Sequence, residues 1–76
     1  MEIKTKYNIG DHVWVLYENR GEICVYDDYI NEIVIGGEKI FYSTREALEE
    51  FKEEDVMLYE DEEILVKRIK ELLENC

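Results

Sequence analysis

The sequence predicts an α+β protein in which a small, strongly curved antiparallel sheet of four to five strands is followed by two helices. Two observations predict this fold class. Residues 7–43 alternate runs of β-branched and aromatic residues with turn residues, a pattern typical of short antiparallel strands. From residue 44 onward the apolar residues recur instead at intervals of three and four, as they do along a helix. With 76 residues, we expect a single domain over 1–76.

The expected strands are four, and they lie at His12–Tyr17, Glu22–Tyr26, Tyr29–Ile35 and Lys39–Tyr42. Turns are predicted between them at residues 18–21, at Asp27-Asp28 and at Gly36-Gly37. Asparagine and glycine tolerate positive φ, so the last pair is the clearest hairpin signal in the chain. Residues 56–59 fit either a short closing strand or an extended link.

Two helices are predicted after the strands. Ser43 followed by Glu46 fits a capping box, which predicts an acidic helix over about 44–53 with Ala47, Leu48 and Phe51 turned inward. A terminal helix is predicted over about 61–74, where apolar residues form one stripe.

A core is expected where the apolar faces of these elements meet. Its predicted members are Val13, Val15, Ile23, Val25, Ile33, Ile35, Ile40, Leu48, Phe51, Leu65, Ile69 and Leu72. Trp14 and Phe41 are expected to join it, because a chain this short needs its largest side chains to build a core.

The run YNIGDHVWVL at residues 7–16 resembles the start of small SH3-like barrel proteins that occur widely in Gram-positive bacteria and their phages. In those proteins a strand-rich barrel is followed by a segment similar to FYSTREALEEF, residues 41–51 here, and by a terminal helix. The resemblance implies an SH3-like barrel and a phage or mobile-element context. It implies no residue roles.

Negative charge is concentrated in one part of the chain. The net charge is −11, and residues 44–63 hold ten carboxylates against two cations, Arg45 and Lys52. Those carboxylates are Glu46, Glu49, Glu50, Glu53, Glu54, Asp55, Glu60, Asp61, Glu62 and Glu63. A dense anionic surface repels nucleic acid and anionic lipid and attracts basic protein surfaces. We therefore expect a basic protein surface as partner, with no direct nucleic-acid binding and no membrane.

Enzyme chemistry is poorly supported. Cys24 as a nucleophile would need a base, and His12 is the only histidine. The spacing and glycine of a calcium-binding loop are missing, so we expect no metal and no cofactor. The N-terminus has no apolar signal segment, from which we expect a cytoplasmic protein with Cys24 and Cys76 reduced.

The leading functional hypothesis is a non-enzymatic inhibitor that imitates nucleic acid. Outward carboxylates on a helix at 44–53 would stand about 5–6 Å apart, continued by the acidic residues up to Glu63. Such a row would occupy the basic site of a host defence protein, such as a CRISPR or restriction nuclease.

Two alternatives stay open. The first is an SH3-like interaction module in which the acid only confers solubility and contacts come from the strands or from a loop tip. The tip residues are Tyr26, Asp27, Asp28 and Tyr29. The second is a homodimer built on the terminal helix.

Overall fold

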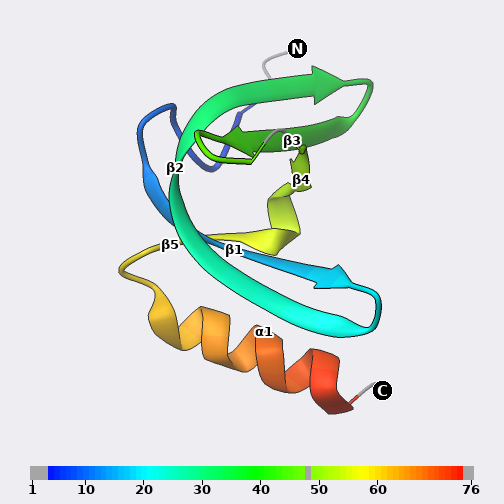
Figure 1. Ribbon diagram of the computed structural model, residues 1–76. Coiled ribbons are helices and arrows are strands. Elements are labelled where there is room, and N and C mark those ends of the chain that lie inside the picture. Colours follow the sequence, from blue (N-terminus) through cyan, green and yellow to red (C-terminus); the bar gives the residue numbers. More distant parts are fainter. Residues whose placement is uncertain (1–3, 48, 75–76) are drawn as a thin grey trace.

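The computed structural model describes residues 4–47 and 49–74 (Figure 1). In chain order its elements are β1 (His12–Asn19), β2 (Glu22–Gly36), β3 (Lys39–Thr44), β4 (Phe51–Lys52), the 3₁₀ turn η1 (Glu53–Asp55), β5 (Val56–Leu58) and α1 (Glu62–Glu74). The strands form one antiparallel sheet in the order β4-β3-β2-β1-β5. The predicted α+β class and the antiparallel sheet are confirmed.

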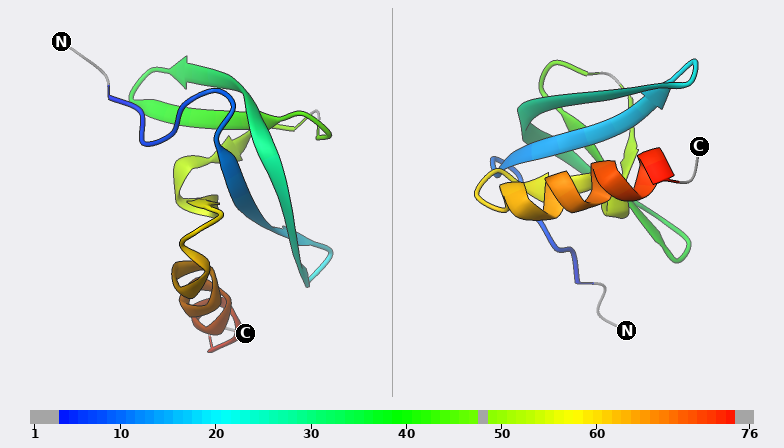
Figure 2. Two further views of the ribbon diagram at one scale, coloured as in Figure 1. Left: turned by 90° about the vertical axis from the view of Figure 1, so that its left-hand side faces the viewer. Right: turned by 90° about the horizontal axis from the view of Figure 1, so that it is seen from below.

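β2 is one strand of 15 residues that serves both halves of the sheet. Its first half pairs with β1, from Asn19 opposite Glu22 to His12 opposite Tyr29, and its second half pairs with β3. A register shift lies between Ile30 and Glu32, where the long strand curves across the molecule (Figure 2). A bulge of this kind bends a strand without ending it.

The predicted turn at Asp27-Asp28 is therefore wrong, and the two strands expected on either side of it are one. Asp27 pairs with Trp14, and Asp28 pairs with Val13, in the ladder between β1 and β2. Both hairpin predictions are confirmed. Arg20 and Gly21 have φ of 53° and 83° in the first turn, and Gly37 has φ of 62° in the second. Such positive values suit the two-residue turns that connect twisted strands.

The sheet is open rather than a closed barrel. β4 and β5 stand at the two ends of the strand order, and no pairing joins them within the described residues. These end strands have two and three residues, and short end strands offer little edge for another chain to pair with. Residues 56–58 form a strand against β1 rather than a link.

The predicted helix over 44–53 is wrong, and α1 is the one α-helix within residues 4–47 and 49–74. Ser43 and Thr44 end β3, residues 45–47 and 49–50 have no regular secondary structure, and Phe51 pairs with Tyr42 in the sheet. Thr44 pairs with Ile30 of β2, Phe51 pairs with Tyr42 of β3, and both residues are buried. These tertiary contacts outweigh the local capping signal. Leu48 lies outside the described residues.

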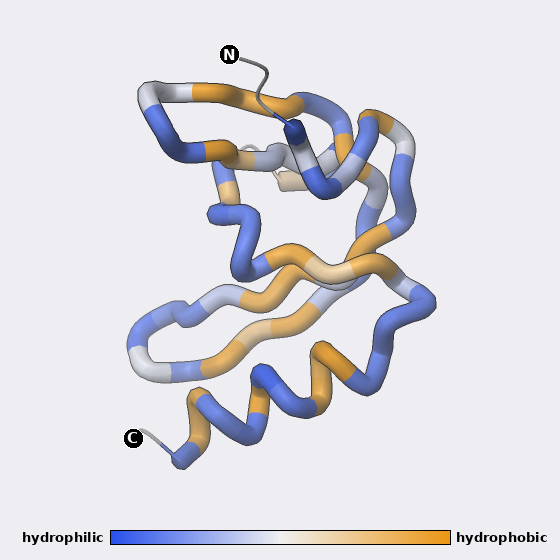
Figure 3. The backbone as a smooth tube through the Cα atoms, turned by 180° about the vertical axis from the view of Figure 1, so that it is seen from behind, coloured by the Kyte–Doolittle hydropathy of each residue, from blue (hydrophilic) through white to orange (hydrophobic). Residues whose placement is uncertain are grey.

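The terminal helix is confirmed as α1. The carbonyl of Asp61 accepts hydrogen bonds from the backbone N–H groups of Ile64 and Leu65 and begins the helix. Hydrophobic and hydrophilic residues alternate along it, as Figure 3 shows. Of the predicted stripe, Leu65 is buried and Ile69 and Leu72 are half-buried, whereas Leu73 is 60% exposed, so its inclusion is wrong. No helix among the described residues has the length and hydrophobicity needed to cross a membrane.

The core lies on both faces of the curved sheet. On the concave inner face the buried residues are Tyr7, Val13, Val15, Ile30, Tyr42, Phe51 and Val56. On the outer face Leu16 and Met57 pack beneath Leu65 of α1. The sheet therefore curves around the first cluster on its inner face and carries α1 over the second cluster on its outer face.

The predicted core is correct in part. Val13, Val15, Phe51 and Leu65 are buried, whereas Val25 and Ile35 are 37% and 48% exposed, so their prediction is wrong. The other described members are half-buried, namely Ile23, Ile33, Ile40, Ile69 and Leu72. Trp14 and Phe41 are also half-buried. Buried residues that the sequence did not predict are Tyr7, Leu16, Ile30, Tyr42, Val56 and Met57.

Candidate functional site

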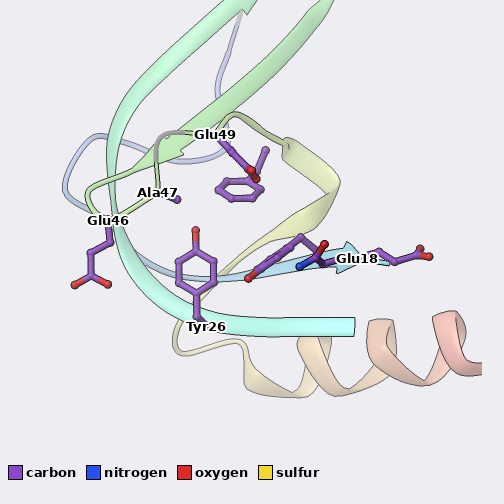
Figure 4. Close-up of a pocket in the computed structure, with 8 residues that line it drawn as sticks. Glu18, Tyr26, Glu46, Ala47 and Glu49 are labelled. Carbon is purple, nitrogen blue, oxygen red and sulfur yellow. The ribbon is translucent and has the colours of Figure 1, made fainter. Parts of the chain in front are cut away.

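A groove of about 530 Å³ opens on the inner face between the loop that joins β3 to β4 and the strands β1 and β2 (Figure 4). We call it the inner groove. Its lining residues are Tyr17, Glu18, Asn19, Tyr26, Glu46, Ala47, Glu49 and Phe51. Three separate segments thus contribute to one hollow.

Three aromatic rings form the apolar part of the inner groove. The ring centroids of Tyr17 and Tyr26 lie 5.8 Å apart at an interplanar angle of 77°, and Phe51 lies 6.1 Å and 6.2 Å from them. The contacts of Tyr26 with Tyr17 and with Phe51 are edge-to-face, an arrangement that aromatic pairs prefer, and the Tyr17–Phe51 contact is tilted at 44°. The Tyr26 hydroxyl shares a hydrogen bond of 3.1 Å with Oγ1 of Thr44, which fixes that ring further.

The two tyrosines keep their protons at neutral pH. Burial raises the pKa of Tyr26, although the Thr44 hydroxyl opposes this. A hydrogen bond with the Cys24 side chain raises the pKa of Tyr17. In both cases the negative charge of Glu49 adds to the rise. The groove therefore presents neutral rings in a negative potential.

Three carboxylates complete the inner groove, from Glu18, Glu46 and Glu49. Tyr26 stands up from β2 into the hollow, while the carboxylates of Glu18 and Glu46 point outward (Figure 4). Among the described lining residues there is no lysine, arginine or histidine. Aromatic faces beside carboxylates favour a cation with an apolar stem.

A buried carboxylate positions the loop that carries Glu46. Asp28 is 6% exposed, its Oδ1 accepts the N–H of Tyr29 at 2.7 Å, and its Oδ2 accepts the N–H of Glu46 at 2.9 Å. Arg45 adds a backbone hydrogen bond of 3.1 Å to the carbonyl of Tyr29. Burial acts to raise the pKa of Asp28, but these N–H groups, the Thr44 hydroxyl and the charge of Arg45 together hold it below its usual value.

The predicted contact residues fall into different places. Tyr26, Glu46 and Glu49 meet in the inner groove, although the sequence assigned them to two separate features. The predicted tip does not exist, because successive residues of a strand point to opposite faces. Tyr26 and Asp28 belong to the inner face, while Asp27 and Tyr29 lie on the outer one.

The other predicted carboxylates do not form a continuous row. Glu53 accepts a hydrogen bond from the Tyr42 hydroxyl, Asp55 lies 3.9 Å from Arg68, and the Asp61 backbone begins α1. Glu50, Glu54 and Glu60 are exposed outside regular secondary structure or in η1, and Glu62 and Glu63 form the first turn of α1. Without a helix at 44–53, the even spacing predicted for a phosphate-like row is absent.

Sequence reasoning missed Tyr17, Glu18 and Asn19 as groove residues. For Tyr17 a signal exists in the alternation of β1, since Val13, Val15 and Tyr17 share a face. For Glu18 and Asn19, only the position of the loop after β3 shows that they line the inner groove.

A row of four stacked rings crosses the outer face, and we call it the aromatic ladder. Tyr29 stacks on His12 at 4.6 Å, His12 on Tyr59 at 4.0 Å, and Tyr59 on Trp14 at 4.8 Å, all within 18° of parallel. The register explains it, because Tyr29 of β2 lies opposite His12 of β1, and the Tyr59 N–H bonds the His12 carbonyl from the other side. Nε2 of His12 lies 2.8 Å from Oδ2 of Asp27, and Trp14 Nε1 donates to the Tyr59 carbonyl at 3.0 Å.

A second groove, of about 390 Å³, differs from the inner groove in charge. Lys6, Lys39 and Lys52 line it beside Phe41, Ile40, Glu53 and Glu54. These lysines make it less suited to a cationic ligand than the inner groove. Over residues 4–47 and 49–74, no group of three or more histidine, cysteine or acidic side chains is placed to hold a metal ion.

Comparison of the chain with protein-family models gives no match, and comparisons with curated proteins and with solved structures give none either.

Proposed function

We propose that this protein is a non-enzymatic binding protein that holds a basic segment of a partner protein in the inner groove. One observation carries the proposal: the groove combines three aromatic rings with three carboxylates and has no cation among its described lining residues. A lysine or arginine side chain matches this surface, since its stem packs on the rings and its charge meets the carboxylates.

The charge of the whole chain supports the same class of partner. With a net charge of −11, the protein attracts a basic segment from a distance and speeds the encounter. The neutral rings of Tyr17 and Tyr26 then provide contact area at low cost in side-chain entropy. Association of this kind weakens as salt screens the charges.

The inhibitor proposal is a special case in which the basic partner surface is a nucleic-acid site of a host defence protein. The net charge and the exposed carboxylates favour it, but the helical spacing that suggested a phosphate-like row does not contribute. A phage or mobile-element origin, an SH3-like family and a cytoplasmic location belong to the same proposal. Recovery of a nuclease by affinity capture from a bacterial lysate, with duplex DNA competing for it, would favour this case; capture that DNA does not affect would argue against it.

The groove itself is tested with a fluorescent hexalysine peptide and matched charge variants. Glu46→Gln with Glu49→Gln removes two carboxylates from the groove, while Glu62→Gln with Glu63→Gln removes two from the first turn of α1. We expect the groove pair to weaken binding by about 3- to 10-fold, as two contact ion pairs would, and the helix pair by less than about 2-fold. Equal losses in both pairs, or no binding by the wild-type protein at low salt, would contradict the proposal.

A further inference from the structure

The outer end of the aromatic ladder differs from the rest of it. His12 and Tyr59 have both ring faces covered, because each stacks between two neighbours. Trp14 stacks on Tyr59 and packs beside the outer core of Leu16, Met57 and Leu65. Tyr29 stacks on His12 through one face only and is 41% exposed.

The second face of Tyr29 is covered by this chain's own Arg45. The guanidinium carbon lies 5.0 Å from the ring centroid, within the range of a cation–π contact. Arg45 is exposed and forms no ion pair with a carboxylate among the described residues, although its charge helps to lower the pKa of Asp28. In so acidic a protein, Arg45 stands on the Tyr29 ring and not in an ion pair with a described residue, so this ring face accommodates a guanidinium group.

We infer that the ring face of Tyr29 opposite His12 is a binding site for an arginine side chain of the basic partner, and that Arg45 fills this site in the free protein. The inference rests on the function proposed above. A planar guanidinium stacks on a ring as a lysine ammonium does not. Asp27 is the next outward residue on β2, but its carboxylate lies 2.8 Å from Nε2 of His12, and Arg45 on the Tyr29 ring makes no ion pair with it. The ring is therefore the group that holds an arginine at this site.

The loop after β3 links this site to the inner groove. Arg45 lies on Tyr29, and the following residue, Glu46, lines the groove. The hydrogen bonds from Arg45 to the Tyr29 carbonyl and from Glu46 to Asp28 hold both residues at the same edge of β2. A basic segment that crosses this edge contacts the groove with one side chain and Tyr29 with another.

The test compares fluorescent hexaarginine and hexalysine peptides on two variants that each remove one cation and keep an apolar stem. Arg45→Met empties the Tyr29 face, and Lys39→Met removes a charge from the β2–β3 hairpin as the control. We expect Arg45→Met to bind hexaarginine about 2- to 5-fold more tightly than Lys39→Met does, the range of an exposed cation–π contact. The gain for hexalysine should be smaller.

A double-mutant comparison checks the ring itself. In a Tyr29→Leu background, Arg45→Met should bring no gain beyond Lys39→Met. The inference is overturned if the two variants bind hexaarginine equally, if Arg45→Met weakens binding, or if the gain persists without the Tyr29 ring. Failure of the proposed function has a different signature, since then neither peptide binds the wild-type protein or the two groove carboxylates have no effect.

Discussion

Asp28 and Glu46 are joined by a hydrogen bond of 2.9 Å between a buried carboxylate and a backbone N–H group. The two residues are 18 positions apart. This contact ties the loop after β3 to the middle of β2. It therefore determines where the groove residues Glu46, Ala47 and Glu49 stand.

Asp28→Asn should destabilise the protein by about 1.5–3 kcal/mol, because hydrogen bonds to a charged acceptor are lost and an amide donor faces backbone N–H groups. Urea unfolding at neutral pH measures the loss, and Asp27→Asn on the exposed face is the control. The folded-state pKa of Asp28 lies below the ordinary 3.8. Its stabilising effect is thus present above pH 3.8 and lost as pH falls through the folded pKa. A difference between wild type and variant that did not shrink in acid would contradict this.

Tyr42→Phe should cost about 1–3 kcal/mol at neutral pH, since buried groups lose their partner. The Tyr42 hydroxyl donates to Oε2 of Glu53 at 2.5 Å and accepts the N–H groups of Lys6 and Tyr7 at 3.1 Å and 3.3 Å. Thermal unfolding measures the loss. The control is Tyr59→Phe, which removes a hydroxyl on the other face of the sheet.

The same variant should change the response to alkali. Burial and the bond to Glu53 raise the pKa of Tyr42 from 10.0 to about 12. Between these values the folded protein keeps a proton that the unfolded chain loses, so stability falls as pH rises. The Tyr42→Phe variant should lack the part of this loss of stability that comes from Tyr42. Tyr7 and Tyr26, whose pKa values are also raised, contribute equally to the loss in wild type and variant. Identical alkaline slopes would show that the Tyr42 proton is not retained.

Phe51→Ala should cost about 3–5 kcal/mol, the range for removing a buried aromatic ring. Phe51 is 7% exposed and packs on Tyr17 and Tyr26, so its loss also removes one wall of the inner groove. Denaturant unfolding is the measurement. Phe41→Ala, at a half-buried position of the neighbouring strand, should cost less. If Phe51→Ala unfolded at the same denaturant concentration as wild type, the Phe51 ring would have to lie outside the core.

Acid and salt should both stabilise the protein. Burial first, and then the charge of Glu54, raise the pKa of Asp55, while Arg68 and Lys52 oppose the rise. Stability should increase as pH falls from neutrality through the folded pKa toward 3.8, because the folded state binds the proton first. Asp55→Asn should lack part of this increase.

The salt effect follows from the net charge of −11. Raising salt from about 0.01 M to about 1 M shortens the screening length about tenfold, so the midpoint of urea unfolding should rise. Equal midpoints at both concentrations would mean that the carboxylates do not repel one another appreciably in the fold.

Local sequence signals predicted the elements whose stability is mostly local. The glycine-containing turns at residues 20–21 and 37–38 and the apolar stripe of α1 each depend on a few neighbouring residues. Local signals failed at Asp27-Asp28 and at Ser43. The acidic pair looked like a turn because a lone carboxylate in a strand lacks partners, yet Asp28 finds them in Tyr29 and Glu46.

The sequence by itself determined that this chain has antiparallel strands, a terminal helix and a strongly anionic surface, because periodicity, turn chemistry and charge are written in consecutive residues. Only the tertiary structure decided that β2 is continuous, that residues 45–47 and 49–50 lie outside regular secondary structure, and that Tyr17, Tyr26 and Phe51 line one groove together with Glu18, Glu46 and Glu49. Those features depend on contacts between residues far apart in the chain, such as Asp28 with Glu46 and Tyr42 with Phe51. The burial and hydrogen bonds of such contacts outweigh the local preferences that a sequence displays.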